Sequence, residues 1–167
     1  MENLHPYIIL IAGLVPLLVG FVWYHKATFG TAWMAAAGVN PDSGKKPNMA
    51  LIFGLTYLFS CFMGVILSSI VIHQFGFFSM IADLPGVNDP NSENGQMAKH
   101  MMDLYGQNFR TFKHGSFHGI ITGIMFAMPI LAVNALFERK NAKYILINAG
   151  FWVVCLALMG GLICAFL

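Results

Sequence analysis

Two histidines with helical spacing stand at the start of a long apolar run. They are His114 and His118, within the segment FKHGSFHGI at residues 112–120. Side chains four residues apart lie about one turn apart on the same face of a helix. Two imidazoles in that arrangement can hold one Zn²⁺ or another divalent transition metal ion, and they can also take up protons near neutral pH. The pair is therefore a candidate metal or proton site.

A third metal ligand would have to come from another part of the chain. The candidates are His5, His73, Glu2 and Asp83. His100 is disfavoured in the same site, because a continuous helix rising 1.5 Å per residue would place it about 21 Å from His114. The competing interpretation is that these histidines merely mark membrane interfaces, which tolerate this residue type.

A second group of soft ligands precedes this pair. Its members are Met97, His100, Met101 and Met102. Thioethers together with an imidazole can bind Cu(I). The same methionines also recur at helical spacing with Leu104 and Tyr105, which favours the apolar face of an amphipathic helix as the main interpretation.

The composition indicates that membrane helices position these side chains. Of the 167 residues, 57% are apolar and only 10% are charged, which is far from the average of soluble domains. A run of about 20 apolar residues is enough to cross a hydrocarbon layer about 30 Å thick. The sequence predicts an all-α membrane protein of one domain with four transmembrane helices, at residues 7–24, 49–75, 115–137 and 144–167.

The second and third predicted spans are joined by a polar segment at about residues 76–114, for which we expect a loop followed by the amphipathic helix. The formal net charge is only +2, and no continuous basic stripe occurs, so nucleic acid is not an expected partner. The expected surroundings are the lipid bilayer. The three cysteines lie in apolar runs and are interpreted as small hydrophobic side chains.

The distribution of basic residues predicts the orientation in the membrane. Six Lys or Arg residues lie in the first and third connections, and three lie in the second. The six are Lys26, Lys45, Lys46, Arg139, Lys140 and Lys143. Because basic loops stay in the cytoplasm, both termini and the long polar segment are expected on the outer side of the membrane. This topology gathers five of the six histidines at the outer surface and leaves only His25 inside.

Small residues form a strip along the third predicted span. Gly115, Gly119 and Gly123 are spaced by four, and such strips let two helix backbones approach closely in lipid. The packing partner could be the fourth span, the first span or a second copy of the chain. Pro16 and Pro129 predict kinks in the first and third spans. We expect Asn134 and Asn148 to bond to each other across the last hairpin.

Signatures of catalysis are missing from the sequence. It has no phosphate-binding glycine loop, no HExxH motif and no nucleophile with a matching histidine and acid. No catalytic residue is therefore assigned, and we do not expect an enzyme.

Two segments resemble a known family. GFVWYHKATFGTAWMAAAG at 20–38 and LFERKNAKYILINAGFWVVCLALMGG at 136–161 are similar to the four-helix bacterial membrane proteins grouped as domain of unknown function 1761. The resemblance covers nearly the whole chain and implies the same four-helix topology, but it implies no reaction, ligand or catalytic residue. The long outward segment resembles the versions found in Bacteroidota, which implies the bacterial inner membrane.

The sequence as a whole favours a small packing or assembly subunit that forms a homo-oligomer or joins a larger membrane complex. The first alternative is a metal-binding or proton-responsive protein whose candidate ligands are His114, His118, His73 and His5. The second alternative is a small channel or carrier.

Overall fold

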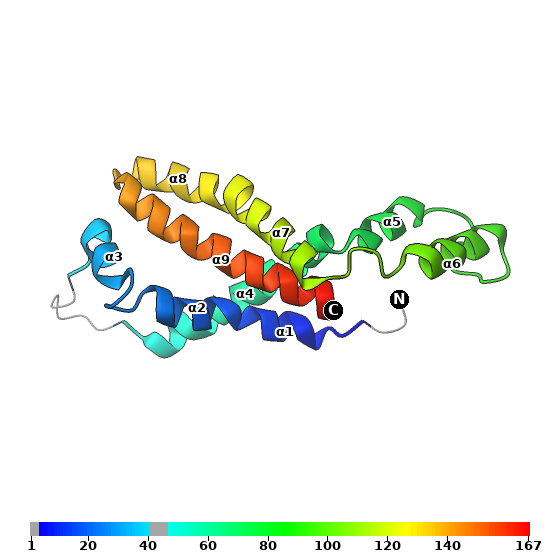
Figure 1. Ribbon diagram of the computed structural model, residues 1–167, viewed down its shortest axis with the longest axis horizontal. Coiled ribbons are helices and arrows are strands. Elements are labelled where there is room, and N and C mark those ends of the chain that lie inside the picture. Colours follow the sequence, from blue (N-terminus) through cyan, green and yellow to red (C-terminus); the bar gives the residue numbers. More distant parts are fainter. Residues whose placement is uncertain (1–3, 41–46) are drawn as a thin grey trace.

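The computed structural model describes residues 4–40 and 47–167, and over these ranges it contains helices and no strands (Figure 1). The helices, in chain order, are α1 (Tyr7–Gly13), α2 (Val15–Trp23), α3 (Gly30–Ala37), α4 (Met49–Val71), α5 (His73–Ile81), α6 (Glu93–Tyr105), α7 (Phe112–Thr122), the π-helix η1 (Gly123–Ala127), α8 (Met128–Phe137) and α9 (Ala142–Phe166). The prediction of an all-helical chain is confirmed for the described residues.

Three of the described helical segments are long and apolar enough to cross a membrane. They are Met49–Val71, Phe112–Phe137 and Ala142–Phe166, of 23, 26 and 25 residues. The second of them is the continuous run of α7, η1 and α8. The apolar segment Tyr7–Trp23 is shorter, so a fourth span at this place stays a prediction.

The helix bounds differ from the expected spans. The second span was expected to continue to residue 75, but α4 ends at Val71 because Ile72 adopts an extended backbone with φ −109° and ψ 96°. The third begins at Phe112 instead of 115 and the fourth at Ala142 instead of 144, each after a residue whose side chain accepts from the first turn. The starts of these two helices are therefore set by N-caps.

The two prolines lie beside irregularities of the backbone. Pro16 occupies the first turn of α2, directly after the break between α1 and α2 at Leu14. Pro129 lies in the first turn of α8, directly after η1. A proline has no N–H and its ring crowds the carbonyl four residues earlier, and a π turn relieves both problems.

Helix α9 forms the centre of the bundle (Figure 1). It contacts α1, α2, α4, α7 and α8. Its side chains Cys155, Met159, Ile163 and Cys164 are fully buried, together with Leu67 and Val71 of α4. Half of the residues in its most apolar stretch are buried inside the protein, compared with 17% in the corresponding stretch of Met49–Val71. In a bilayer, α9 is thus the helix enclosed by the others and α4 presents most of its surface to lipid.

The glycine strip of α7 and η1 faces α9. A methyl group added at Gly115 would collide with the backbone of Gly160, one at Gly119 with the backbone of Leu156, and one at Gly123 would lie 2.7 Å from Val153 Cα. Such distances leave no room for any side chain, so the two backbones touch along the whole strip. Of the three possible packing partners, the fourth predicted span is the one that occupies this surface.

At the end of the bundle where α3 lies, a polar cluster connects α9 to α2 and α3. Asn148 Oδ1 accepts from Tyr24 Oη at 3.0 Å and from Trp33 Nε1 at 3.2 Å. Its Nδ2 donates to Tyr144 O at 2.8 Å. The prediction of a bond between Asn148 and Asn134 is wrong. The side chain of Asn148 turns toward α2 and α3, where its Oδ1 accepts both hydrogen bonds.

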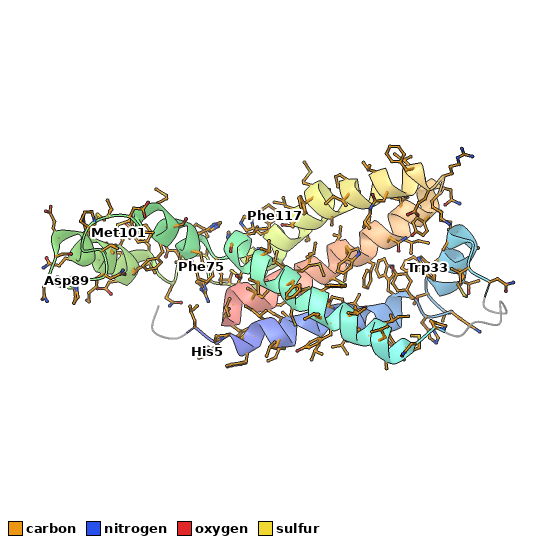
Figure 2. All side chains as sticks on the ribbon, turned by 180° about the vertical axis from the view of Figure 1, so that it is seen from behind. His5, Trp33, Phe75, Asp89, Met101 and Phe117 are labelled. Atoms are coloured by element: carbon orange, nitrogen blue, oxygen red, sulfur yellow. The ribbon has the colours of Figure 1, made fainter. Side chains whose placement is uncertain are left out.

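Helices α5 and α6 extend beyond the end of the bundle where α1 begins and α9 ends (Figures 1 and 2). Met101 and Asp89 lie in this extension, and Trp33 lies at the opposite end of the molecule (Figure 2). Gln74 ties the two helices, since its Nε2 donates to Tyr105 O at 3.3 Å and to Asn108 O at 3.0 Å. A helix is therefore present in the expected segment, and its lying on a membrane surface stays a prediction.

The substitution Gly119→Ala should lower the free energy of unfolding by about 1–3 kcal/mol, because the added methyl overpacks the α7–α9 contact. Thermal unfolding of the purified protein in detergent measures this loss. Gly54→Ala is the matched control, since a methyl group there meets nothing within 4 Å. Equal stability of the two variants would contradict the backbone contact.

The substitution Asn148→Ala should cost about 1–3 kcal/mol, because Tyr24 and Trp33 lose their acceptor. Near-ultraviolet circular dichroism should also weaken, as the Tyr24 and Trp33 rings, 5.3 Å apart, become mobile. Asn134→Ala removes an exposed amide and serves as the control. A larger loss for Asn134→Ala would contradict the role of the cluster.

Candidate metal site

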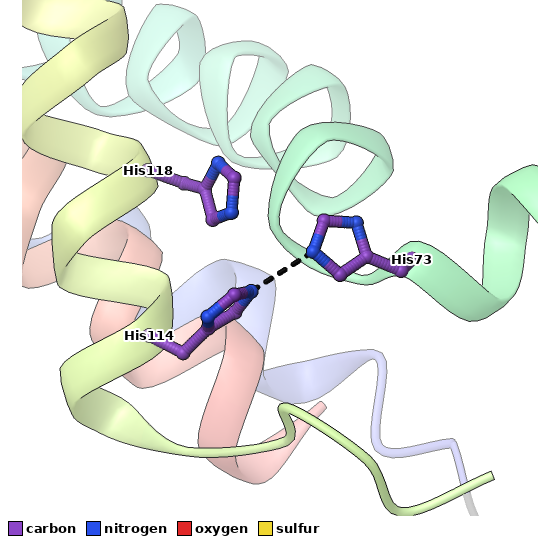
Figure 3. A group of neighbouring side chains, drawn as sticks. All are labelled: His73, His114 and His118. Carbon is purple, nitrogen blue, oxygen red and sulfur yellow. Dashed lines mark hydrogen bonds between the residues drawn. The ribbon is translucent and has the colours of Figure 1, made fainter. Parts of the chain in front are cut away.

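His73 is placed by the break between α4 and α5. Ile72 is fully buried, and its N–H donates to Ser68 O at 3.0 Å. Both the side chain and the backbone of the residue that interrupts the helix are therefore held in place. His73 is then the first residue of α5. Its side chain is exposed at the end of the bundle and directed across toward α7 (Figure 3).

His114 and His118 are placed by the start of α7. The Thr111 hydroxyl accepts from the His114 N–H at 3.2 Å and caps the helix. Both histidines lie half-buried on the face of α7 that looks toward His73 (Figure 3). The flanking Gly115 and Gly119 are fully enclosed against α9. The glycine strip therefore holds α7 in the rotation that presents its two imidazoles to α4 and α5.

Cys164 of α9 contacts the backbone next to both histidine-bearing segments. Its thiol lies 3.3 Å from Val71 O, at the end of α4, and 3.2 Å from Phe109 O, in the connection before α7. Arg110 Nε donates to Cys164 O at 2.9 Å. The interpretation of this cysteine as only a small hydrophobic side chain is incomplete, because a weak donor in a buried position also positions the backbone next to both histidine-bearing segments.

The three imidazoles form one compact group. One nitrogen atom from each of His73, His114 and His118 lies within 4.8 Å of the other two. The ring centroids are 5.0 Å apart for His73 and His114, 5.1 Å for His73 and His118, and 4.6 Å for His114 and His118. The Nε2 atoms of His73 and His114 are 2.9 Å apart and share a hydrogen bond (Figure 3).

These distances are close to those of a metal centre. Three nitrogens at 2.0–2.1 Å from a tetrahedral Zn²⁺ lie about 3.3 Å from one another. The His73 and His114 Nε2 atoms, 2.9 Å apart, are already near this spacing, and the third nitrogen lies within 4.8 Å of both. Within the described residues the group contains no carboxylate or thiolate, so three neutral ligands would leave the charge of the ion uncompensated and one coordination position open.

Phe109 closes the group on the side of the polar extension. Its ring centroid lies 4.9 Å from that of His114 and 5.9 Å from that of His73. The residue adopts φ 63°, a conformation that costs energy for any side chain but glycine and that recurs at functional sites. An aromatic wall lowers the local dielectric and orients the rings it touches.

A pocket of about 300 Å³ adjoins His73 between α5 and α6. Its lining includes Gln74, Met101, Met102 and Phe109. The buried Gln74 Oε1 has no hydrogen-bond partner among the described residues. Met101 and Met102 line this pocket together with His73. His100 is exposed on α6, and the soft-ligand group that includes it stays a prediction.

The remaining candidate ligands lie elsewhere. His5 is at the same end of the bundle, where its N–H donates to Leu167 O at 3.1 Å, but its ring lies against Tyr7 at 5.5 Å and takes no part in the group. Asp83 is likewise outside the group. Glu2 lies outside the described residues. Sequence reasoning did not single out Phe109 or Cys164, and only the left-handed turn of Phe109 makes it conspicuous, which no sequence pattern reveals.

The described residues form an all-helical fold with three helices that are long and apolar enough to cross a membrane. Within that class, the profile of the family described as Protein of unknown function (DUF1761) matches residues 7–164, nearly the whole chain. The chain belongs to this family, which confirms the resemblance. The comparisons with curated proteins and with solved structures return no match. The likeness to Bacteroidota versions stays a prediction.

The substitution Thr111→Ala should lower the free energy of unfolding by about 1 kcal/mol, because the first turn of α7 loses its cap. Thr111→Ser retains a hydroxyl and should keep most of the stability. Chemical or thermal unfolding in detergent compares the two. If Thr111→Ser were as unstable as Thr111→Ala, the cap would not be what fixes the start of α7.

Proposed function

We propose that this protein binds a divalent transition metal ion, Zn²⁺ in the simplest case, through His73, His114 and His118 at the periplasmic rim of its helical bundle. The observation that supports the proposal is the convergence of three imidazole nitrogens within 4.8 Å from two separate chain segments. A hydrogen bond between two neutral rings accounts for the approach of His73 and His114, and a shared ion would account for the approach of the third imidazole as well.

The setting of the group also favours a metal ion. Two of its members are half-buried, and Phe109 shields the side that faces the polar extension. A three-histidine centre with an open position is the arrangement of zinc sites that accept an exogenous ligand. His73 is held by a buried break and His114 by a capped helix start, so the site is preorganised on rigid elements.

The proposed location is the bacterial inner membrane with both termini in the periplasm. The bias of basic residues toward the first and third connections supports it, although Lys45 and Lys46 lie outside the described residues. Lys140 Nζ donates to Ala37 O at 2.6 Å, so these two connections meet at one end of the bundle. The histidine group lies at the opposite end, which is the periplasmic end in this topology.

The role of a packing or assembly subunit is less well supported by the contacts. The glycine strip that could have joined a second copy is filled by α9 of the same chain. Self-association or entry into a larger complex would need another surface. A small channel or carrier stays a prediction, which solute flux into liposomes would test.

Metal analysis of protein purified after incubation with Zn²⁺ and removal of free ion should give about one ion per chain. His118→Ala should weaken binding at least about tenfold, since losing one of three ligands removes a large part of the coordination energy. His100→Ala is the matched control and should bind as the unchanged protein does. Replacement by Co²⁺ should give the visible absorption of a four-coordinate ion.

Failure of the unchanged protein to retain an ion, or equal retention by His118→Ala, would refute the proposal. Thermal unfolding of each variant without metal guards against loss of binding through misfolding. His114→Ala provides a second substitution on the same helix if His118→Ala proves unstable.

A further inference from the structure

An apolar groove of about 540 Å³ runs along the membrane-facing side of the bundle. One wall is α4 with Phe62, Ile66 and Ile70, the other is the run of α7, η1 and α8, and α9 contributes Trp152 and Leu156. The lining is almost wholly hydrocarbon. From Phe62 to Ile70 the groove follows α4 for about 12 Å at 1.5 Å per residue.

The groove begins directly below the histidine group. Thr122, which lines it, lies one helical turn beyond His118, and its hydroxyl donates to His118 O at 2.8 Å. Ile70 lines the opposite wall three residues before His73. The same two chain segments therefore carry the imidazoles at the rim and the apolar walls beneath them.

The π-helix shapes the middle of this groove. Phe126 and Ala127 lie within η1 and line the groove. A π turn widens a helix locally and is frequent at functional sites. Pro129, in the first turn of α8, has no N–H to donate to the preceding turn, which favours the wider turn of η1 before it. The width of the groove is thus built into the backbone and does not rest on side-chain rotamers alone.

The ligand set of the proposed metal centre lacks a negative charge. Three imidazoles are neutral when they coordinate, and no described carboxylate belongs to the group. A divalent ion there keeps its double charge at the edge of a low-dielectric region, where an anion in the open position is strongly favoured. Carboxylate oxygen is an ordinary Zn²⁺ ligand at about 2.0–2.2 Å.

We infer that the metal centre and the groove together bind a single-chain anionic amphiphile, a long-chain carboxylate, with its head on the ion held by His73, His114 and His118 and its alkyl chain along α4 and η1. This inference rests on the proposed metal-binding function. The juxtaposition that carries it is a cationic centre one turn above an elongated apolar groove. A soluble anion would use only the centre, and an uncharged lipid would use only the groove.

Trp152 provides a direct probe because it lines the groove. The other two tryptophans are bonded at the opposite end of the bundle, Trp23 to Ile147 O and Trp33 to Asn148. Bromine atoms quench tryptophan fluorescence at close range. Titration of the zinc-loaded protein in detergent with 9,10-dibromostearate should therefore quench the emission in a saturable way, and Trp152→Phe should remove most of this quenching.

The head group is tested with the methyl ester of the same acid, which has the identical chain and no charge. The acid should bind about tenfold more tightly than the ester when Zn²⁺ is present, and about equally after EDTA treatment. An unbrominated stearate should reverse the quenching, whereas acetate at the same concentration should not. A brominated phosphatidylglycerol tests whether a diacyl anionic lipid is taken in place of the free acid.

The outcomes separate the two proposals. Equal affinity for acid and ester in protein that metal analysis shows to hold zinc would overturn the long-chain carboxylate and leave the metal site standing. Reversal by acetate, or tighter binding of the phosphatidylglycerol, would also overturn it. Absence of zinc from the protein would instead refute the metal-binding function. Ile66→Phe, which adds bulk to the groove away from the ligands without adding a tryptophan, should weaken binding of the acid without changing the metal content.

Discussion

The close contact between the backbones of α7 and α9 is the constraint on which the candidate site depends. With Gly115, Gly119 and Gly123 pressed against α9, α7 can neither rotate about its axis nor slide along its partner without a collision. In lipid there is no hydrophobic gain from bringing two apolar helices together, so complementary packing has to supply the specificity. The histidines that alternate with these glycines inherit their direction from this contact.

The second half of the site depends on a break rather than on a helix. If α4 continued past Val71 as a regular helix, position 73 would follow the helical rotation and its direction would be fixed by α4 alone. The extended, buried Ile72 resets the direction of the chain, and Cys164 bonds the Val71 carbonyl beside this break. Helix α9 thus holds both histidine-bearing segments, one through the thiol of Cys164 and the other through the contact with the glycines of α7. The group can therefore form at the rim of a bundle whose interior is almost entirely apolar.

The histidine group and the groove adjoin each other and present two kinds of surface. Each is ordinary on its own in a membrane protein, where interfaces tolerate histidine and helices often leave apolar gaps. Because they are continuous, the metal ion proposed at the rim and the hydrocarbon slot below it would match the two ends of an amphiphile. The irregular features of the backbone, the turn at Phe109, the break at Ile72 and the π-helix at residues 123–127, all adjoin this site, as expected where structure departs from local preference for function.

The sequence by itself determined what depends on composition and on local periodicity: the helical membrane class, the approximate extent of the three long helices, the pairing of His114 with His118 and the small-residue face of α7. Helical geometry relates residues a few positions apart without reference to the rest of the molecule. Only the tertiary structure decided that His73 and not His5 joins the pair, that α9 receives the glycine strip and that Asn148 bonds Tyr24 and Trp33 in place of Asn134. These contacts join residues 30 to 124 positions apart, and their register follows from how whole helices pack and where the chain breaks, which no short pattern of residues encodes.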